Sequence, residues 1–324
     1  MTERVKLKHI NARSIAEAIY VLGEYQEEAK IIAGGVDLIS LIKNEVLGPN
    51  VLVNIKTIPE LAYIKEDAEG LKIGALTTIN DIEMSPIISS KYTVLAEAAH
   101  SVAGPQIRNM GTIVGNLCQD VRCWYYRRSP VIGRSFFCYR KGGKLCYAVG
   151  GDNRYHAVIG GKRCYAVCPS DMAPALVALK AKVKIASAVG ERVMPVEEFY
   201  IPLGNILKPD EIITELQVPA VLPDSRQRYL KFRLRKAIDF ALSSVAAVIT
   251  VDDGVVSTAG IVLGGVAPIP YRATATEEAL HGEMVTKTVA EAAAKAALIE
   301  AKPLSMNAYK LPIIEALVRK AILG

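Results

Sequence analysis

Ile31-Ile32-Ala33-Gly34-Gly35-Val36-Asp37-Leu38 is the stretch that decides the fold. A short strand-like run enters two adjacent glycines, and a helical segment (38–43) follows them. Glycine lets the backbone approach a ligand closely, and the free N–H groups at a helix start can bind a phosphate. A tight structural turn explains the same glycines equally well. The three-glycine spacing of a Rossmann fold is absent, so a nicotinamide site of that kind is not expected.

A second loop of small residues follows later in the chain, Gln106-Ile107-Arg108-Asn109-Met110-Gly111-Thr112-Ile113-Val114-Gly115-Asn116-Leu117. We expect a turn-rich loop over 109–115. It adds a hydroxyl and an amide to the small residues. Two such loops can hold the two phosphates of a pyrophosphate from opposite sides.

The pattern around these loops predicts an α+β protein with three units. Residues 1–56 are typical of a small α/β unit, in which Ser14 and Glu17 form a capping-box pattern before an apolar stripe. Residues 57–218 form a larger α+β unit. After a linker with two prolines (219–224), residues 219–324 predict a three-stranded antiparallel sheet packed with helices. The expected strands are 228–235, 244–251 and 255–263, and the expected helices are 285–301 and 306–322.

The composition is that of an ordinary globular protein, with 324 residues, 51% of them hydrophobic and 22% charged. The start of the chain lacks an apolar signal core, and no apolar run is long enough to span a bilayer. These features predict a cytoplasmic protein without membrane contact, in a compartment where thiols stay reduced.

All six cysteines fall between Cys118 and Cys168, and residues 119–167 also hold nine of the twenty aromatic residues. The same segment holds ten Lys or Arg and two acids, a local charge of +8 in a chain of +6. Charge concentrated on one segment favours an anion or an acidic protein partner over a nucleic acid. The compartment disfavours disulfides, and zinc prefers C-x2-C pairs, which are absent. A [4Fe–4S] cluster tolerates irregular spacing, so it is favoured over zinc or no metal.

The two loops resemble the paired FAD pyrophosphate motifs of the flavin-containing subunits of the xanthine dehydrogenase family of molybdenum enzymes. Three further segments resemble that family in the same order: Pro169-Ser170-Asp171-Met172-Ala173-Pro174-Ala175-Leu176, Pro209-Asp210-Glu211-Ile212-Ile213, and Lys231 to Ala241 with Arg235-Lys236 and Asp239. The resemblance covers nearly the whole chain. It implies that units 1–56 and 57–218 together bind FAD and that 219–324 is the C-terminal domain of a flavin subunit.

The resemblance also implies the cofactor-binding residues. The loops would hold the diphosphate and ribityl chain, Asp171 would bond the flavin nucleotide, and Lys231 would approach the isoalloxazine. A helix N-cap is the competing role for Asp171. Val114 departs from the usual glycine, and a β-branched residue does not take a positive φ cheaply. The full expected set is Ile31, Ile32, Ala33, Gly34, Gly35, Val36, Asp37, Leu38, Val102, Gly111, Thr112, Ile113, Val114, Gly115, Asn116, Asp171 and Lys231.

In that family the second loop runs almost directly into the Asp171 motif, so residues 119–167 are an insert. Cys118 and Cys168 belong to the flanking motifs, which leaves Cys123, Cys138, Cys146 and Cys164 as the expected cluster ligands. His156 is expected to pack within the insert. A flavin subunit with such an insert resembles the β subunits of 4-hydroxybenzoyl-CoA reductases, down to the stretches CWYY and GDNRYHA.

This resemblance implies a small subunit with two [2Fe–2S] clusters and a large subunit with a molybdopterin cofactor, in a dimer of heterotrimers. It implies reductive dehydroxylation on the molybdenum subunit. Electrons would enter from an acidic ferredoxin, pass through [4Fe–4S] and FAD, and continue to the partners, so no catalytic acid or base is expected in this chain. Two alternatives stay open. One is the flavin subunit of a hydroxylase that sends electrons outward to NAD or a quinone. The other is a non-enzymatic, zinc-stabilised assembly or docking protein.

Overall fold

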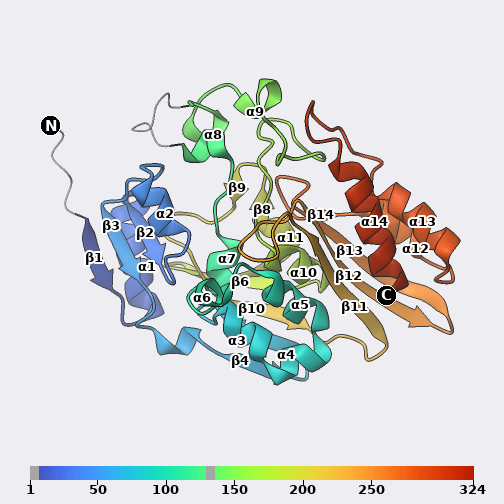
Figure 1. Cartoon of the computed structure of the whole chain (residues 1–324). Coiled ribbons are helices and arrows are strands. Elements are labelled where there is room, and N and C mark those ends of the chain that lie inside the picture. The colour runs from blue at the N-terminus through green and yellow to red at the C-terminus, as the bar shows by residue number, and fades with distance from the viewer. Residues whose placement is uncertain (1–6, 129–135) are drawn as a thin grey trace.

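The computed structural model describes residues 7–128 and 136–324 of the chain, and Figure 1 shows how its elements are arranged. The N-terminal unit is a three-stranded parallel sheet in the order β1-β3-β2. Its elements are β1 (Lys8–Asn11), α1 (Ile15–Tyr25), β2 (Ala29–Ile32), α2 (Leu38–Lys43) and β3 (Val51–Asn54). At the start of α1 the Ser14 Oγ accepts from the Glu17 backbone N–H at 3.1 Å, so the expected cap is present.

The second unit is a five-stranded antiparallel sheet in the order β4-β5-β10-β6-β7. Its strands are β4 (Ile64–Asp67), β5 (Gly70–Gly74), β6 (Lys182–Ser187), β7 (Gly190–Pro195) and β10 (Ile212–Pro219), with a small pair β8 (Tyr200–Ile201) and β9 (Gly204–Asn205) beside it. Its helices are α3 (Ile79–Met84), α4 (Pro86–Lys91), α5 (Thr93–Ser101), α6 (Pro105–Arg108), α7 (Ile113–Leu117), α10 (Met172–Ala178) and α11 (Val196–Phe199).

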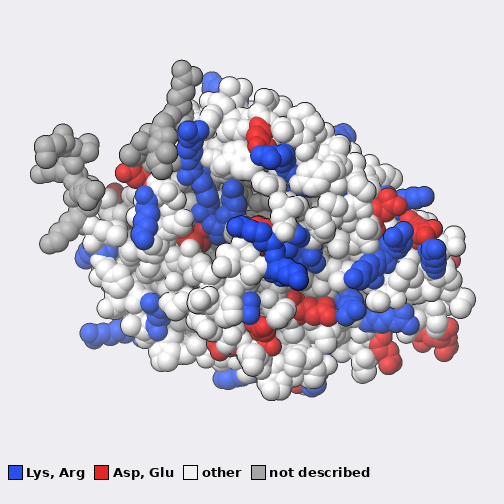
Figure 2. Space-filling view, in the orientation of Figure 1, with Lys and Arg blue, Asp and Glu red and all other residues white. Residues whose placement is uncertain are grey.

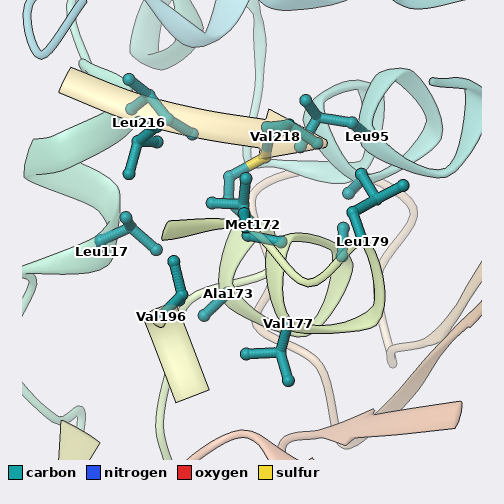
Figure 3. Close-up of a cluster of buried hydrophobic side chains, with 14 of the residues drawn as sticks. Leu95, Leu117, Met172, Ala173, Val177, Leu179, Val196, Leu216 and Val218 are labelled. Atoms are coloured by element: carbon teal, nitrogen blue, oxygen red, sulfur yellow. The ribbon is translucent and has the colours of Figure 1, made fainter. Parts of the chain in front are cut away.

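Helix α10 lies at the centre of the main hydrophobic core (Figure 3). All seven of its residues are buried, which is the pattern of a helix enclosed on every side. Figure 3 shows Met172 pointing toward Leu216 and Val218 of β10, with Leu95 of α5 nearby. The core therefore fixes α10, and with it the loop that precedes α10, relative to the sheet.

The C-terminal unit is a four-stranded antiparallel sheet in the order β11-β12-β13-β14, so the expected three-stranded sheet has a short fourth strand. Its elements are β11 (Ser225–Phe232), β12 (Ser243–Asp252), β13 (Val255–Gly264), β14 (Tyr271–Arg272), α12 (Thr274–Leu280), α13 (Lys287–Ala296) and α14 (Lys310–Leu323). Asp253 and Gly254 both have positive φ, 46° and 82°, as a tight hairpin between β12 and β13 requires. Helix α12 was not expected, and α13 is shorter than the predicted 285–301 helix.

The cysteine insert (residues 119–167) has little regular structure in its described part. It contains α8 (Trp124–Arg127), α9 (Tyr147–Gly150), one turn of 3-10 helix at Tyr139–Lys141, and an isolated bridge between Cys138 and Leu145. Figure 1 shows α8 and α9 at the edge of the molecule, on the side away from α3 and α4. Arg134, one of the ten basic residues counted in the insert, lies outside the described residues.

One expected loop is partly helical. Residues 109–115 were expected to be a loop, but α7 begins at Ile113 because the Thr112 Oγ accepts from the Gly115 backbone N–H at 3.1 Å. Val114 therefore has a helical backbone and is not among the residues with positive φ, so its β-branched side chain is accommodated without strain.

Among the described residues no helix is long and apolar enough to cross a bilayer.

Candidate functional site

A cavity of about 680 Å³ lies where the two glycine loops, the loop before α10 and the start of the insert meet. Cofactor sites of this size are usually lined by apolar groups with a few placed polar ones. All eight residues from Ile31 to Leu38 line it, and so do Val102, Gly111, Thr112, Val114, Gly115, Asn116 and Asp171. Ile113 does not line the cavity, because its side chain is fully buried in the main core.

The two glycine loops touch each other at Gly34. A Cβ atom on Gly34 would lie 1.8 Å from the Met110 carbonyl oxygen, so only glycine allows this approach. Gly35 has a φ of 70°, the left-handed region that favours glycine. The second loop is held in place by backbone bonds from Ile79 N–H to Gly111 O and from Ile113 N–H to Thr77 O, both 2.9 Å. The two glycine loops therefore lie side by side at the cavity.

Asp171 and Lys231 form a buried ion pair beside this cavity. The Lys231 Nζ lies 2.6 Å from the Asp171 Oδ2, and their side chains are 4% and 7% exposed. The Tyr229 hydroxyl donates to the Asp171 Oδ1 at 2.8 Å. Asp171 makes no side-chain cap bond at α10, because the Ser170 Oγ takes that role by accepting from the Ala173 N–H at 3.0 Å.

Lys231 does not line the cavity, and it also donates to the Ser101 carbonyl at 3.1 Å. Its position makes it a support for Asp171 on the C-terminal sheet. The carboxylate of Asp171 is thereby fixed between the C-terminal unit and the cavity wall.

The four inner cysteines meet at one small cavity inside the insert. Cys123, Cys138, Cys146 and Cys164 all line it, and its volume is about 20 Å³. Cys118 and Cys168 do not; they line the large cavity and pack on the main core. Burial raises the pKa of both outer thiols to about 12, as it also does for Cys123, so the position of the thiols and not their pKa separates the two groups. The inner four cysteines thus line one cavity and the outer two line another.

The side chains around this small cavity decide which kind of metal centre it suits. Among the described residues, no three His, Cys, Asp or Glu side chains are placed to hold a single metal ion. A four-iron cluster is much larger than one ion, and its four thiolates lie further apart. Four cysteines around one cavity, within a segment poor in backbone pairing, match that donor set.

Cys123 lies beside a histidine of the same insert. Burial raises the pKa of its thiol to about 12, so without a bound metal it is protonated at neutral pH. The His156 Nε2 lies 3.2 Å from the Cys123 Sγ. Burial lowers the pKa of His156 to about 4, with a smaller contribution from the charge of Lys310. The ring is therefore neutral at pH 7 and can donate one hydrogen bond to a thiolate at Cys123.

The two cavities share part of a wall. Tyr126 and Arg140 line both the large cavity and the cysteine cavity. The Tyr126 hydroxyl donates to Asp120 at 2.6 Å, and the Arg140 guanidinium lies 3.2 Å from the same carboxylate. A third cavity of about 230 Å³ lies between them, lined by Cys123 and His156 on one side and by Asp171 and Phe240 on the other.

Sequence reasoning did not identify Arg122, Tyr126, Arg140 and Phe240 as residues of the large cavity. The first three come from the insert and Phe240 from the loop after β11. For the three insert residues, the only available signal was that the insert directly follows the second glycine loop. This indicates that the insert begins at the cavity, but it does not indicate which of its side chains line the cavity.

A large cavity between paired glycine loops, also lined by loop residues of the C-terminal unit (238–240 and 268), is suited to a nucleotide cofactor. Comparison with known proteins identifies the family of this chain. Residues 5–221 match the family described as "FAD binding domain in molybdopterin dehydrogenase", and residues 228–324 match "CO dehydrogenase flavoprotein C-terminal domain". The chain belongs to this family of FAD-binding subunits of molybdenum-containing oxidoreductases.

Relatives cover nearly the whole chain. The carbon monoxide dehydrogenase medium chain of Hydrogenophaga pseudoflava is 29% identical over 96% of this chain and 93% of its own. The aldehyde oxidoreductase FAD-binding subunit PaoB of Escherichia coli is 34% identical over 87% of each chain. A solved structure of carbon monoxide dehydrogenase from Hydrogenophaga pseudoflava aligns with a TM-score of 0.79 at 28% identity, over 98% of this chain and 96% of that one.

Proposed function

We propose that this chain carries both FAD and a [4Fe–4S] cluster in a molybdenum complex of the 4-hydroxybenzoyl-CoA reductase type. In that complex, reduced ferredoxin would supply electrons for reductive dehydroxylation to benzoyl-CoA on the molybdenum subunit. A [2Fe–2S] small subunit and a molybdenum large subunit would be its partners, in a dimer of heterotrimers. The observation that carries the proposal is the meeting of four inner cysteines at a cavity that shares Tyr126 and Arg140 with the flavin cavity.

The residues that would hold FAD are those of the two loops and the cavity wall. When bound, FAD exchanges one or two electrons, so it can join one-electron clusters to a two-electron site. The close approach at Gly34 and the fixed carboxylate of Asp171 define the shape of the cavity before any cofactor enters. The protein's part is to bind and orient the flavin, which needs no acid or base in this chain.

The residues that would hold the cluster are Cys123, Cys138, Cys146 and Cys164. A cluster with four thiolates carries net negative charge. Arg163, which lines the same cavity and forms no ion pair in the described part of the chain, offers a compensating cation. Tyr125 and Tyr147 also line the cysteine cavity, and both pack edge-on against Phe136, at ring-centroid distances of 5.0 and 4.9 Å. These rings surround the cysteines with apolar surface. Such a surface would shield a bound cluster from water.

The outer surface of the insert fits an acidic protein donor. Figure 2 shows Lys and Arg side chains gathered across the middle of the face that it presents, below the edge where Figure 1 places α8 and α9. Part of the insert's +8 charge is neutralised internally, because Arg122 and Arg127 pair with Asp37 and Arg140 pairs with Asp120. Other cations stay exposed without an ion pair in the described part of the chain: Lys144, Lys162 and Arg163. Phe137, Leu145 and Val149 are exposed apolar side chains in the same insert.

An anaerobic assay of the intact complex tests the proposal. With reduced ferredoxin, we expect 4-hydroxybenzoyl-CoA to be converted to benzoyl-CoA, and we expect the insert cluster to titrate at a lower potential than the flavin. The competing function is a hydroxylase with outward electron flow, which the names of the relatives favour. Reduction of NAD or a quinone by an aldehyde, without any dehydroxylation, would overturn the proposed direction.

A further inference from the structure

The cysteine insert contributes an arginine to the flavin cavity. Arg122 lies four residues beyond Cys118, inside the insert, yet its side chain lines the large cavity together with the first glycine loop. Arg127, from the same insert, does not line that cavity. The two arginines therefore differ in their access to a bound cofactor, although both reach the same carboxylate.

Arg122 is held in one orientation by three neighbours. Its Nη1 donates to the Asp37 Oδ1, its Nη2 donates to the Gln119 Oε1 at 2.9 Å, and its guanidinium lies 4.8 Å from the centre of the Phe240 ring. A guanidinium has five N–H donors in a planar fork, and these two bonds use only part of them. The side chain is 25% exposed, and its Nε is buried without a hydrogen-bond partner among the described residues.

The charge at this place matches an anion. Asp37 lies in the first glycine loop, where a lone carboxylate would repel a diphosphate. Two arginines surround it, since the Arg127 Nη2 lies 2.7 Å from the same Oδ1. The Asp120 backbone N–H also donates to the Asp37 Oδ2 at 2.7 Å. Asp37 thus binds both arginines of the insert, and they neutralise its charge. Asp37, Arg122 and Arg127 together carry an excess positive charge beside the loop.

We propose that Arg122 is a FAD-binding residue supplied by the insert and that it binds the diphosphate, the anionic part of the nucleotide. Asp37 and Gln119 position it. The insert then completes the flavin cavity as well as enclosing the cysteine cavity. Loss of insert structure would consequently release FAD, even though the two glycine loops stay intact.

Nucleotide binding to the flavin-depleted complex tests this inference, with FAD and ADP as probes. A charge-assisted hydrogen bond contributes about 1.5–3 kcal/mol, so Arg122→Gln should weaken the binding of both probes by about 10- to 150-fold. ADP contains the diphosphate but no isoalloxazine, so its loss of affinity locates the contact. Arg127→Gln is the comparison variant, because Arg127 neutralises Asp37 and donates to the Asp120 and Val121 carbonyls but does not line the cavity, and it should lower the affinities less than Arg122→Gln does.

Arg122→Lys is a second variant in case Arg122→Gln does not fold, since lysine keeps the charge but loses the fork. Its affinity for ADP should lie between those of Arg122→Gln and the unchanged protein. Unchanged FAD and ADP affinity in the folded Arg122 variants would overturn the inference. So would equal losses in Arg122→Gln and Arg127→Gln, which would assign the effect to Asp37 alone.

Discussion

Replacement of Gly34 by alanine should separate the two glycine loops and weaken FAD binding. The new Cβ would lie 1.8 Å from the Met110 carbonyl oxygen and 2.7 Å from its carbon. Real Cβ contacts essentially never fall below 3.0 Å, so the two backbones must move apart by about 1.2 Å. The second loop cannot yield freely, because its bonds to Thr77 and Ile79 fix it to the start of α3.

Overpacking of this kind costs about 1–3 kcal/mol. If the strain is relieved only when the cavity opens, the affinity for FAD falls by about 5- to 150-fold. The assay is the quenching of flavin fluorescence on binding to the flavin-depleted complex, together with FAD per chain after gel filtration. Gly23→Ala is the matched control: an added Cβ there meets no atom within 4 Å, and in the interior of α1 it should stabilise the protein by about 0.5–1 kcal/mol.

Wild-type FAD affinity in Gly34→Ala would refute the reasoning, because the close approach of the loops would then not be required for the cofactor. Loss of folding in Gly34→Ala without FAD would point to a structural role for the contact. Thermal unfolding with and without FAD separates these outcomes.

Three further changes test other parts of the structure. Lys231→Met leaves the Asp171 carboxylate buried without its cation, so chemical denaturation should show a free energy of unfolding lower by about 3–5 kcal/mol. The double variant with Asp171→Asn should restore part of this loss. A loss below about 1 kcal/mol in Lys231→Met would contradict the assignment. Burial lowers the pKa of Lys310 to about 7 from 10.5, so the unfolded chain binds this proton more tightly and stability should rise with pH between those values, by at most about 1.4 kcal/mol per pH unit. Lys310→Met should flatten that rise, and equal slopes in the two proteins would contradict the assignment. The rate of reduction by ferredoxin should fall as salt is raised, because exposed cations are screened; a rate insensitive to ionic strength would exclude electrostatic docking.

Much of the fold could be predicted from local patterns. Helix α2 has the predicted bounds, and α1 begins at the predicted Ser14 cap, because capping and apolar periodicity act over a few residues. The hairpin at Asp253-Gly254 was predictable for the same reason. The 109–115 loop was different: Thr112 caps α7 only when its hydroxyl turns toward Gly115, and Thr112 also bridges to Thr78 from another segment.

The division of the cysteines followed from the motifs, because Cys118 and Cys168 belong to segments whose neighbours build the flavin cavity. The side chains that the insert returns to that cavity could not be predicted. Arg122 and Arg140 are placed by Asp37 and Asp120, and such ion pairs across long sequence separations leave no periodic pattern. The ion pair between Lys231 and Asp171 likewise joins residues far apart in the sequence, so no local pattern indicates it.

Iron content of the intact complex, measured for single cysteine variants, tests most directly whether the four inner cysteines hold a cluster beside the flavin. Cys123→Ser should lower the iron by about four atoms per FAD and remove the corresponding electron paramagnetic resonance signal, because the cluster needs four thiolates. Cys118→Ser should keep both, since Cys118 lines the flavin cavity. Loss of iron in Cys118→Ser, with full iron in Cys123→Ser, would contradict the assignment of the cluster to the inner cysteines.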